Sequence, residues 1–471
     1  MLYAKKPRPE TLASLSEVAL FPFWLDDPRR PEPADTLTYS TTADLLVIGA
    51  GFTGLWTALL AKETNPSLDV VLIEAKETAM GASGVNGGFM SASLTHGFVN
   101  GLARWPDEIG KLISLGHENL DGISSTVECF NIECDFLRSG EITVATEPYQ
   151  LEDFRQVMEK SMEFGENLQW LDLERLRGLV NSPTYLGAIF DPLVTMVNPA
   201  QLAWGLRRAC IQSEVRLFEQ TPVTHLDFDG KKITASTSYG SVRANHVALA
   251  TNAFPPLLRK LSWYIVPVYD YALVTEPLSA NQRESIGWVD RQGVGDSGNL
   301  FHYYRTTSDG RILWGGYDAV YHWNNGFGSR HENCPSTFGR LADHFFQTFP
   351  QLEGLSFTHA WGGPIDTCSR FTVFWGTVHD GRTAYSVGYT GLGVGASRFG
   401  AKVMLDLLSG HKTDLTMLKM VQQKPIPFPP EPFRAIGINL TRWSLEQADH
   451  HRGNRNLWLR TLDRFGVGFD S

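Results

Sequence analysis

The most informative residues in this sequence are the glycines of a single short run, Gly49-Ala50-Gly51-Phe52-Thr53-Gly54. In a GxGxxG motif the first glycine allows a tight turn. The second lets a pyrophosphate approach the backbone, and the third lets a helix pack closely on a sheet. Glu74 follows at the spacing of the acid that accepts hydrogen bonds from a ribose diol. These residues predict a dinucleotide site, but both NAD and FAD enzymes carry them.

Two further glycine-rich segments favour the larger, flavin-containing dinucleotide. Residues 79–89 (AMGASGVNGGF) follow Glu74, where a flavin needs an extended backbone along its diphosphate and ribityl chain. Residues 388–395 (GYTGLGVG) lie between a predicted strand and a predicted helix, so their free N–H groups suit a polar ring edge or a developing negative charge. A simple NAD domain needs only one such junction.

The sequence around the first motif predicts the strands and the helix that position these loops. Residues 43–48 form an apolar strand that runs into the glycines, residues 53–64 have a helical pattern, and residues 69–74 form a second buried strand. This βαβ unit is typical of a parallel sheet. Helices are also predicted at 199–213, 337–349 and 397–408, and residues 264–317 read as all-β.

Candidate substrate contacts come from a predicted hairpin at residues 300–318 (LFHYYRTTSDGRILWGGYD). A two-residue turn at Asp309-Gly310 would pair Arg305 with Trp314. Strand alternation then places Tyr303, Arg305 and Trp314 on one face, together with Phe301 and Ile312, and Tyr304 on the other. Arg305 is suited to binding a carboxylate or phosphonate. The alternative is that these aromatic residues only pack and that Arg305 is solvated.

Composition excludes several other classes of function. The chain has 471 residues and a net charge of -10 without a basic run, so neither nucleic acid nor an anionic membrane is an expected partner. No signal peptide or apolar stretch of membrane-spanning length is present, which predicts a cytoplasmic protein without a membrane span. The five cysteines lack CxxC spacing and the histidines lack metal-like spacing, so we predict no metal site.

Four segments resemble the D-amino-acid-oxidase-like flavoproteins, which include glycine oxidase, sarcosine oxidase and the γ-glutamylputrescine oxidoreductases. They are residues 44–61 (DLLVIGAGFTGLWTALLA), 81–88 (GASGVNGG), 247–254 (VALATNAF) and 388–403 (GYTGLGVGASRFGAKV). The likeness is strongest to the γ-glutamylputrescine oxidoreductase branch, which commonly has arginine where this chain has Val85.

The resemblance implies a bound FAD. It places Gly49, Gly51, Thr53, Gly54 and Glu74 on the ADP half and Val223 at the adenine. The residues expected along the diphosphate and the flavin ring are Ala82, Ser83, Asn86, Gly87, Gly391, Gly393 and Gly395. We predict non-covalent binding, because no histidine replaces Asn86 and the neighbours of Cys368 do not match the flavin-linking motif of sarcosine oxidase.

The implied fold is α/β, with a Rossmann-type FAD-binding domain interleaved with an α+β substrate domain built on a largely antiparallel sheet. The FAD-binding domain would comprise residues 43–95, 160–262 and 360–412, and the substrate domain residues 96–159 and 263–359. Residues 1–42 would form an extended arm and residues 413–471 a C-terminal extension.

The implied activity is oxidation of a small amine or N-alkyl amino acid by hydride transfer to the flavin, giving an imine that hydrolyses, with O2 or another acceptor taking the electrons. Tyr303, Arg305 and Trp314 are the catalytic candidates, and Tyr304, Arg370 and Tyr389 are candidates for substrate contact. A lysine that promotes the oxygen reaction of sarcosine oxidases falls near Trp314, so we expect slow reaction with oxygen. An NAD(P)-dependent dehydrogenase and an electron-transfer subunit of a larger complex are the alternatives.

Overall fold

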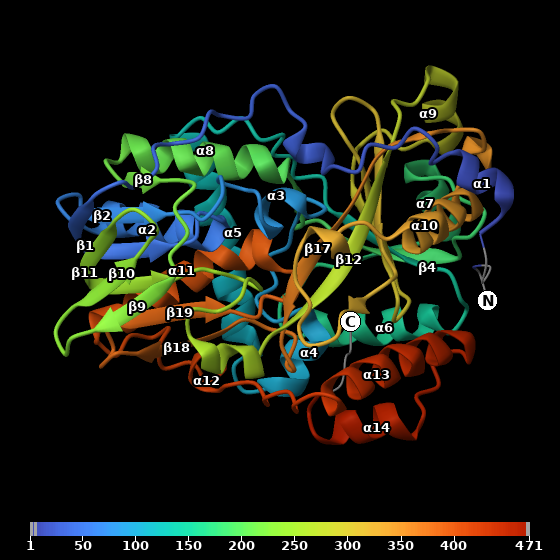
Figure 1. Cartoon of the computed structure of the whole chain (residues 1–471). Coiled ribbons are helices and arrows are strands. Elements are labelled where there is room, and N and C mark those ends of the chain that lie inside the picture. Colours follow the sequence, from blue (N-terminus) through green and yellow to red (C-terminus); the bar gives the residue numbers. More distant parts are fainter. Residues whose placement is uncertain (1–2, 4–6, 468–471) are drawn as a thin grey trace.

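Two large sheets dominate the computed structural model, which describes residue 3 and residues 7–467 (Figure 1). One sheet lies on the left of Figure 1 around β1 and β11, and the other on the right around β12 and β17. Each sheet takes strands from widely separated parts of the chain. The predicted α/β fold with two interleaved sheets is therefore confirmed.

The first sheet is a parallel sheet extended by antiparallel strands at two places. Its order is β18-β19-β11-β1-β2-β8, and the pairs from β19 to β8 are parallel. Strands β18 and β10 pair antiparallel with β19 and β11, and β9 pairs with β10. The strands are β1 (Ser40–Ile48), β2 (Val70–Ile73), β8 (Arg216–Phe218), β9 (His225–Phe228), β10 (Ile233–Ser236), β11 (Ser241–Leu249), β18 (Phe374–Val378) and β19 (Thr383–Val387).

Burial on both faces of β1 explains its continuous apolar sequence. Leu45 and Val47 enter the core that contains the helices, while Leu46 and Ile48 enter a second core beneath β9 and β10. Helix α2 (Phe52–Thr64) follows the glycine turn and packs against α8 (Pro199–Gln212) and α11 (Gly393–Ser409). The predicted βαβ unit is present within three residues of its expected bounds.

The second sheet is largely antiparallel, as predicted. Its order is β16-β12-β15-β14-β13-β4-β6-β5, with β17 also on β12, and only the pair of β13 with β4 is parallel among the described strands. The strands are β4 (Glu141–Ala145), β5 (Gln169–Leu171), β6 (Gly187–Asp191), β12 (Val266–Thr275), β13 (Gly293–Asp296), β14 (His302–Thr306), β15 (Ile312–Gly316), β16 (Val320–Tyr321) and β17 (Phe357–Thr367).

The two faces of this sheet have different surroundings. Its outer face packs against α10 (Pro335–Thr348) through an aromatic core that includes Trp314 and Phe345. Its inner face contributes Ala272, Val274 and Leu313 to the core that contains α2. Residues on the inner face are therefore the ones that can meet the glycine-rich loops.

Two sequence expectations about this region were wrong. Strands β5 and β6 belong to the second sheet, although residues 160–262 were assigned to the FAD-binding domain. The short β5 is flanked by α6 (Gln150–Met162) and α7 (Leu173–Leu179), whose charged helical pattern masked it. The span 264–317 is also not all-β, because Ser279 caps α9 (Ala280–Ile286) with a capping box. The other domain bounds stay a prediction.

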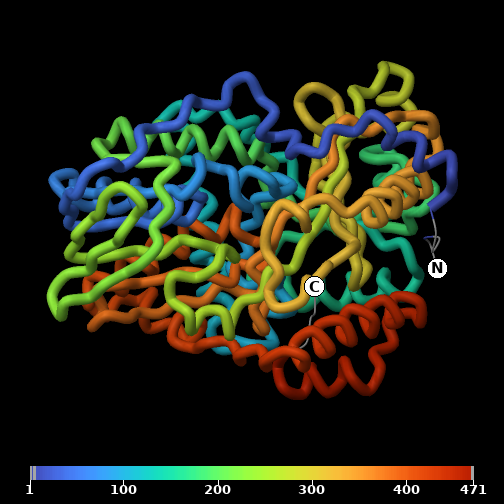
Figure 2. Tube along the Cα trace, viewed as in Figure 1, coloured from blue at the N-terminus to red at the C-terminus, as the bar shows by residue number. Residues whose placement is uncertain are grey.

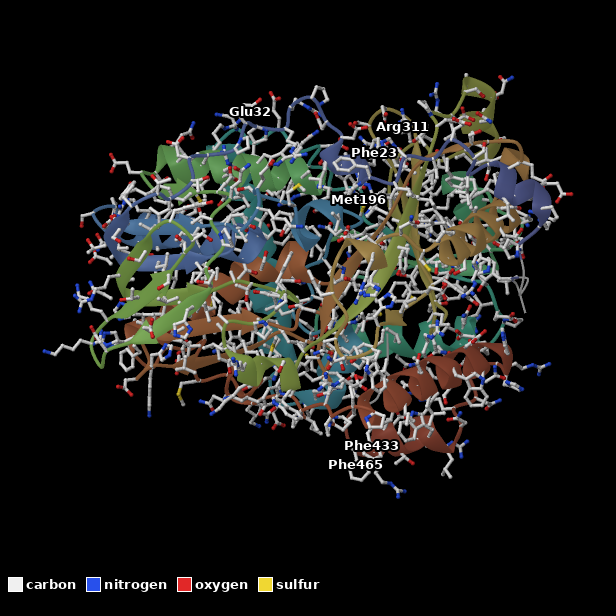
Figure 3. The ribbon with its side chains drawn as sticks, in the orientation of Figure 1. Phe23, Glu32, Met196, Arg311, Phe433 and Phe465 are labelled. Carbon is white, nitrogen blue, oxygen red and sulfur yellow. The ribbon has the colours of Figure 1, made fainter. Side chains whose placement is uncertain are left out.

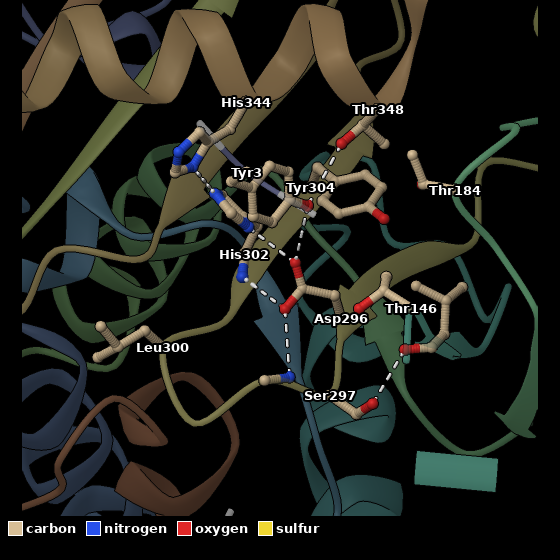
Figure 4. A network of polar contacts seen from close by, with 12 residues as sticks. Tyr3, Thr146, Thr184, Asp296, Ser297, Leu300, His302, Tyr304, His344 and Thr348 are labelled. Carbon is tan, nitrogen blue, oxygen red and sulfur yellow. Dashed lines mark hydrogen bonds and ion pairs between the residues drawn. The ribbon is translucent and has the colours of Figure 1, made fainter. Parts of the chain in front are cut away.

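The N-terminal arm crosses both halves of the molecule, as the blue trace in Figure 2 shows. It contains α1 (Pro9–Ala13) and the 3-10 turn η1 (Phe23–Leu25), and Phe23 lies beside Arg311 (Figure 3). At one end, the Tyr3 hydroxyl donates to Asp296, 3.3 Å away, in the network of Figure 4. At the other end, the Leu37 N–H donates to the Thr221 hydroxyl, 3.1 Å away.

The C-terminal extension is helical; in Figure 1 its first helix lies below β18 of the first sheet and its last two lie below the second sheet. It contains α12 (Lys419–Gln422), α13 (Phe433–His450) and α14 (Leu457–Arg464). Phe433 and Phe465 are exposed at the lower edge of Figure 3. Among the described residues, no helix combines the length and apolarity needed to cross a membrane.

The remaining helices link these parts: α3 (Ala82–Val85), α4 (Phe98–Arg104) and α5 (Ile109–Cys129), with the 3-10 turns η2 (Arg259–Trp263), η3 (Ser329–His331) and η4 (Pro350–Leu352). The two-stranded pair β3 (Phe89–Met90) and β7 (Thr195–Met196) lies directly after the second glycine-rich segment.

Candidate active site

The glycine turn before α2 lies where the motif predicts a bound diphosphate. Gly49 has a φ of +103°, a conformation that other residues rarely adopt. A Cβ on Gly54 would lie 1.8 Å from the Gly49 carbonyl oxygen, so only glycine fits there. A Cβ on Gly51 would meet only the Ser83 side chain, with Oγ at 2.9 Å. The N-terminus of α2 thus opens onto a cradle that suits an anion.

The second glycine-rich segment lies beside this cradle. The Phe52 N–H donates to Ser83 Oγ, 2.9 Å away, which joins α3 to the start of α2. Asn86 stabilises its own loop, because its amide donates to the carbonyls of Ala82 and Ser83 and its Oδ1 accepts from the Gly88 N–H. The expected residues of the two segments are therefore brought together, although the Asn86 side chain serves the loop backbone.

The third glycine-rich segment joins the same region through a chain of hydroxyl groups. Thr53 donates to the Tyr389 hydroxyl at 3.0 Å, and this hydroxyl lies 2.7 Å from Ser386 Oγ. Gly391 has a φ of +95°, and a Cβ on Gly395 would lie 2.2 Å from the Ser91 carbonyl oxygen. The 5% exposed Tyr389 therefore ties α2 to β19, and its contact with the substrate stays a prediction.

Glu74 lies at the carboxyl edge of the first sheet. Its carboxylate accepts from the N–H groups of Ala50 and Lys76, at 2.7 and 2.9 Å. Burial raises the pKa of this carboxyl group. The Thr221 N–H donates to the Glu74 carbonyl, which brings the segment leading to Val223 to the same edge. Ribose contact by Glu74 and adenine contact by Val223 stay predictions.

Three side chains from distant segments hold the carbonyl groups of the second loop. The Trp361 indole donates to the Val85 carbonyl and the Trp24 indole to the Asn86 carbonyl, both at 2.8 Å. Arg305 Nη1 donates to the Gly88 carbonyl at 3.1 Å and also to the carbonyl of Val197 at 2.7 Å. No spacing pattern in the sequence marked Trp24 or Trp361 for this role.

The expectation that Arg305 receives an acidic substrate group is therefore not supported. Its side chain is 0% exposed, lies over the Trp24 ring and is 3.6 Å from Asp135. Burial lowers the pKa of Arg305 to about 9. A guanidinium group committed to backbone carbonyls is a structural support, so we assign Arg305 the role of positioning the loop.

The expected hairpin register was wrong by one residue. Arg305 pairs with Leu313, and Tyr304 pairs with Trp314. The Thr307 N–H donates to the Arg311 carbonyl, which leaves a three-residue loop whose last residue, Gly310, has a φ of +81°. The extra loop residue moves Trp314 to the opposite face from Tyr303.

Trp314 and Tyr304 consequently lie in the core on the outer face of the sheet. Trp314 is fully buried and packs on Tyr304, with ring centroids 4.4 Å apart. The Tyr304 hydroxyl lies 2.7 Å from the hydroxyl of Tyr185. Neither residue contacts the glycine-rich loops, so the expected catalytic role of Trp314 and substrate contact of Tyr304 are wrong. The residue opposite Tyr303 is Gly315 and not Trp314. Neither residue carries the positive charge of the lysine that promotes the oxygen reaction in sarcosine oxidases.

Arg370 is also committed to the protein backbone. Its guanidinium donates to the carbonyls of Thr372, Gln423 and Val373, and its side chain is buried over Trp105. It joins the loop after β17 to the C-terminal extension. These partners do not support contact of Arg370 with the substrate, which stays a prediction.

Tyr303, like Arg305, lies against the second loop, but its hydroxyl is not committed to a backbone carbonyl. A Cβ on Gly87 would lie 2.6 Å from its ring. The Tyr303 hydroxyl donates to Asp270 Oδ2, 2.6 Å away, on the neighbouring inner face of β12. Burial raises the pKa of Asp270 to about 6. Asp270 was missed in the sequence because it lies in a nearly continuous apolar strand with no recognisable motif.

Comparison with known proteins agrees with this arrangement. Residues 44–407 match the model of a family described as FAD dependent oxidoreductase. The chain belongs to this family. The first motif allowed either NAD or FAD, and the family match shows that the cofactor is FAD. The cradle at Gly51 fits the diphosphate of FAD.

Individual relatives cover most of the chain. γ-Glutamylputrescine oxidoreductase from Escherichia coli is 32% identical over 412 residues, which are 84% of this chain and 90% of that protein. A probable oxidoreductase, OrdL, from Haemophilus influenzae is 29% identical over 81% of this chain and 86% of that protein. The structure of glycine oxidase from Geobacillus kaustophilus has a TM-score of 0.67 and 18% identity, covering 82% of this chain and 99% of that chain. The last likeness concerns the fold alone.

We predict that the FAD is released intact by acid precipitation, leaving the yellow colour in the supernatant. Cys368 is fully buried, its thiol donates to the Thr372 carbonyl at 3.2 Å, and burial raises its pKa, all of which disfavour a reactive thiolate. Absorbance of pellet and supernatant measures the outcome. Colour that stays in the pellet and is lost in Cys368→Ser would contradict the prediction.

Proposed function

We propose that this FAD-dependent oxidoreductase oxidises a small amine. The carbon next to the substrate nitrogen loses a hydride, and water hydrolyses the resulting imine. The observation that carries the proposal is the convergence of three glycine-rich loops with Tyr303 on the inner face of the second sheet. The 32% identity to a γ-glutamylputrescine oxidoreductase supports an amine as the substrate class.

The chain's own residues would act mainly by positioning. FAD, when bound, supplies the acceptor for the hydride. The loop of residues 82–88 is fixed in advance by Trp24, Trp361 and Arg305, so it need not be ordered when the cofactor binds. Tyr303 and Asp270 supply the polar groups on the substrate side of this loop. Because the amine reacts in its neutral form, no strong protein base is needed.

Anaerobic reduction of the purified, yellow protein by a panel of amines tests this proposal. We expect at least one amine to bleach the flavin absorbance and to yield an aldehyde or keto product. Alcohols and hydroxy acids of the same carbon skeleton should leave the absorbance unchanged. If no amine reduces the flavin and a partner protein co-purifies, the alternative role as an electron-transfer subunit is favoured.

A further inference from the structure

Asp270 is a half-buried carboxylate that forms no ion pair with a cationic side chain among the described residues. It lies opposite Gly363 in β17, on the sheet face that also carries Tyr303. The Tyr303 hydroxyl donates to it, and the N–H groups of Tyr271 and Gly316 lie close enough to lower its pKa. No lysine, arginine or histidine of residues 3 and 7–467 forms an ion pair with it.

The charge of Asp270 is costly unless something offsets it. Removing a carboxylate from water without an opposite charge is strongly unfavourable, and such groups are retained mainly where they have a function. Burial raises the pKa of this carboxyl group to about 6, but three donors orient the carboxylate and favour its charged form. The site therefore holds a negative charge that a ligand can neutralise.

Asp270 and Tyr303 also differ in accessibility from the two arginines that were expected to bind the substrate. Both keep part of their surface open, whereas Arg305 and Arg370 are buried at 0% and 4% exposure. The two arginines that were expected to bind an acid donate to backbone carbonyls instead. The accessible charge beside the loop is thus negative.

The position of Asp270 connects it to the cofactor loop. A Cβ on its strand partner Gly363 would lie 2.9 Å from the Val85 side chain, and the Tyr303 ring covers Gly87. A molecule bound against residues 85–87 would therefore have the Asp270 carboxylate at its side.

We propose that Asp270, oriented by Tyr303, is the specificity-determining residue that pairs with a second, positively charged nitrogen of the substrate. This inference rests on the proposed oxidation of an amine. The nitrogen beside the oxidised carbon must be neutral to react, so the charge that Asp270 binds belongs to a different nitrogen. The substrate class is a diamine or another amine with a cationic end, and not an acidic amine.

Three four-carbon probes test the inference on the FAD-loaded protein: 1,4-diaminobutane, butylamine and 4-aminobutyrate. They differ mainly in the charge of the end opposite one amine. Calorimetry measures binding, and anaerobic stopped-flow absorbance measures flavin reduction. We expect 1,4-diaminobutane to bind at least about tenfold more tightly than the other two, as a charge-assisted contact implies. Asp270→Asn should remove this advantage, and Asp270→Glu should restore part of it.

The exposed Asp227 provides a matched control, because Asp227→Asn removes one negative charge far from this strand and should leave all three affinities unchanged. The inference is wrong if butylamine or 4-aminobutyrate binds as tightly as the diamine, or if no diamine binding is detected. Both outcomes are measured on the wild-type protein and do not depend on whether the variants fold. If the diamine binds through Asp270 but no amine bleaches the flavin, Asp270 is a site for a cationic ligand, and the proposed amine oxidation is what fails.

Discussion

Gly51→Leu should purify as a folded, colourless protein. In the wild type, a Cβ at residue 51 would meet only the Ser83 side chain, so a larger residue extends into the open cradle and not into the core. A leucine there occupies the space through which a pyrophosphate approaches the α2 N-terminus. We expect FAD content, measured by absorbance at 450 nm relative to 280 nm, to fall below about one tenth of the wild-type value, because the side chain blocks the pyrophosphate.

Gly54→Ala is the informative contrast to Gly51→Leu. Its Cβ would overlap the Gly49 carbonyl oxygen at 1.8 Å, so α2 would have to move away from β1. This variant should lose thermal stability as well as FAD, whereas Gly51→Leu should keep the melting temperature of the wild-type apoprotein. Full flavin content in Gly51→Leu would show that the cofactor does not lie at this turn.

The difference between these two glycines also shows how much of the site the sequence could predict. The GxGxxG motif, its strand and its helix depend on local spacing, so β1, the glycine turn and α2 were all predicted correctly. The proximity of the second and third loops followed from the resemblance to the flavoprotein family. Both kinds of information are carried by contiguous residues.

The errors arise where one residue or one distant partner decides the outcome. The hairpin register depends on whether its loop has two or three residues, and Gly310 supports the longer loop while fitting either reading. A shift by one residue moved Trp314 from the inner to the outer face. Arg305 and Arg370 have typical anion-binding chemistry, but their partners are backbone carbonyls, which leave no mark in a sequence.

Arg305→Met should impair stability, FAD retention and turnover together. The substitution leaves the carbonyls of Gly88 and Val197 buried without this donor, at a cost on the order of 3 kcal/mol. Asp135 is affected less, because it keeps its ion pair with Arg291. Since the loop of residues 82–88 loses one of its three external supports, we expect the dissociation constant of FAD to rise at least about tenfold. Thermal unfolding and fluorescence titration of the apoprotein with FAD measure the two effects.

The substrate dependence of the Arg305→Met defect distinguishes a support from a substrate anchor. A residue that holds the loop affects every substrate through the cofactor, so the rate of flavin reduction should fall by the same factor for acidic, neutral and cationic amines. Arg243→Met serves as the control: this strand arginine pairs with Asp229 at an exposed position, and its loss should change none of these quantities. A defect confined to acidic amines would show that Arg305 binds the acidic group of the substrate. Arg305, and not Asp270, would then determine which charge the enzyme selects in its substrate. A uniform defect would leave the Asp270 carboxylate as the charged group that the substrate meets.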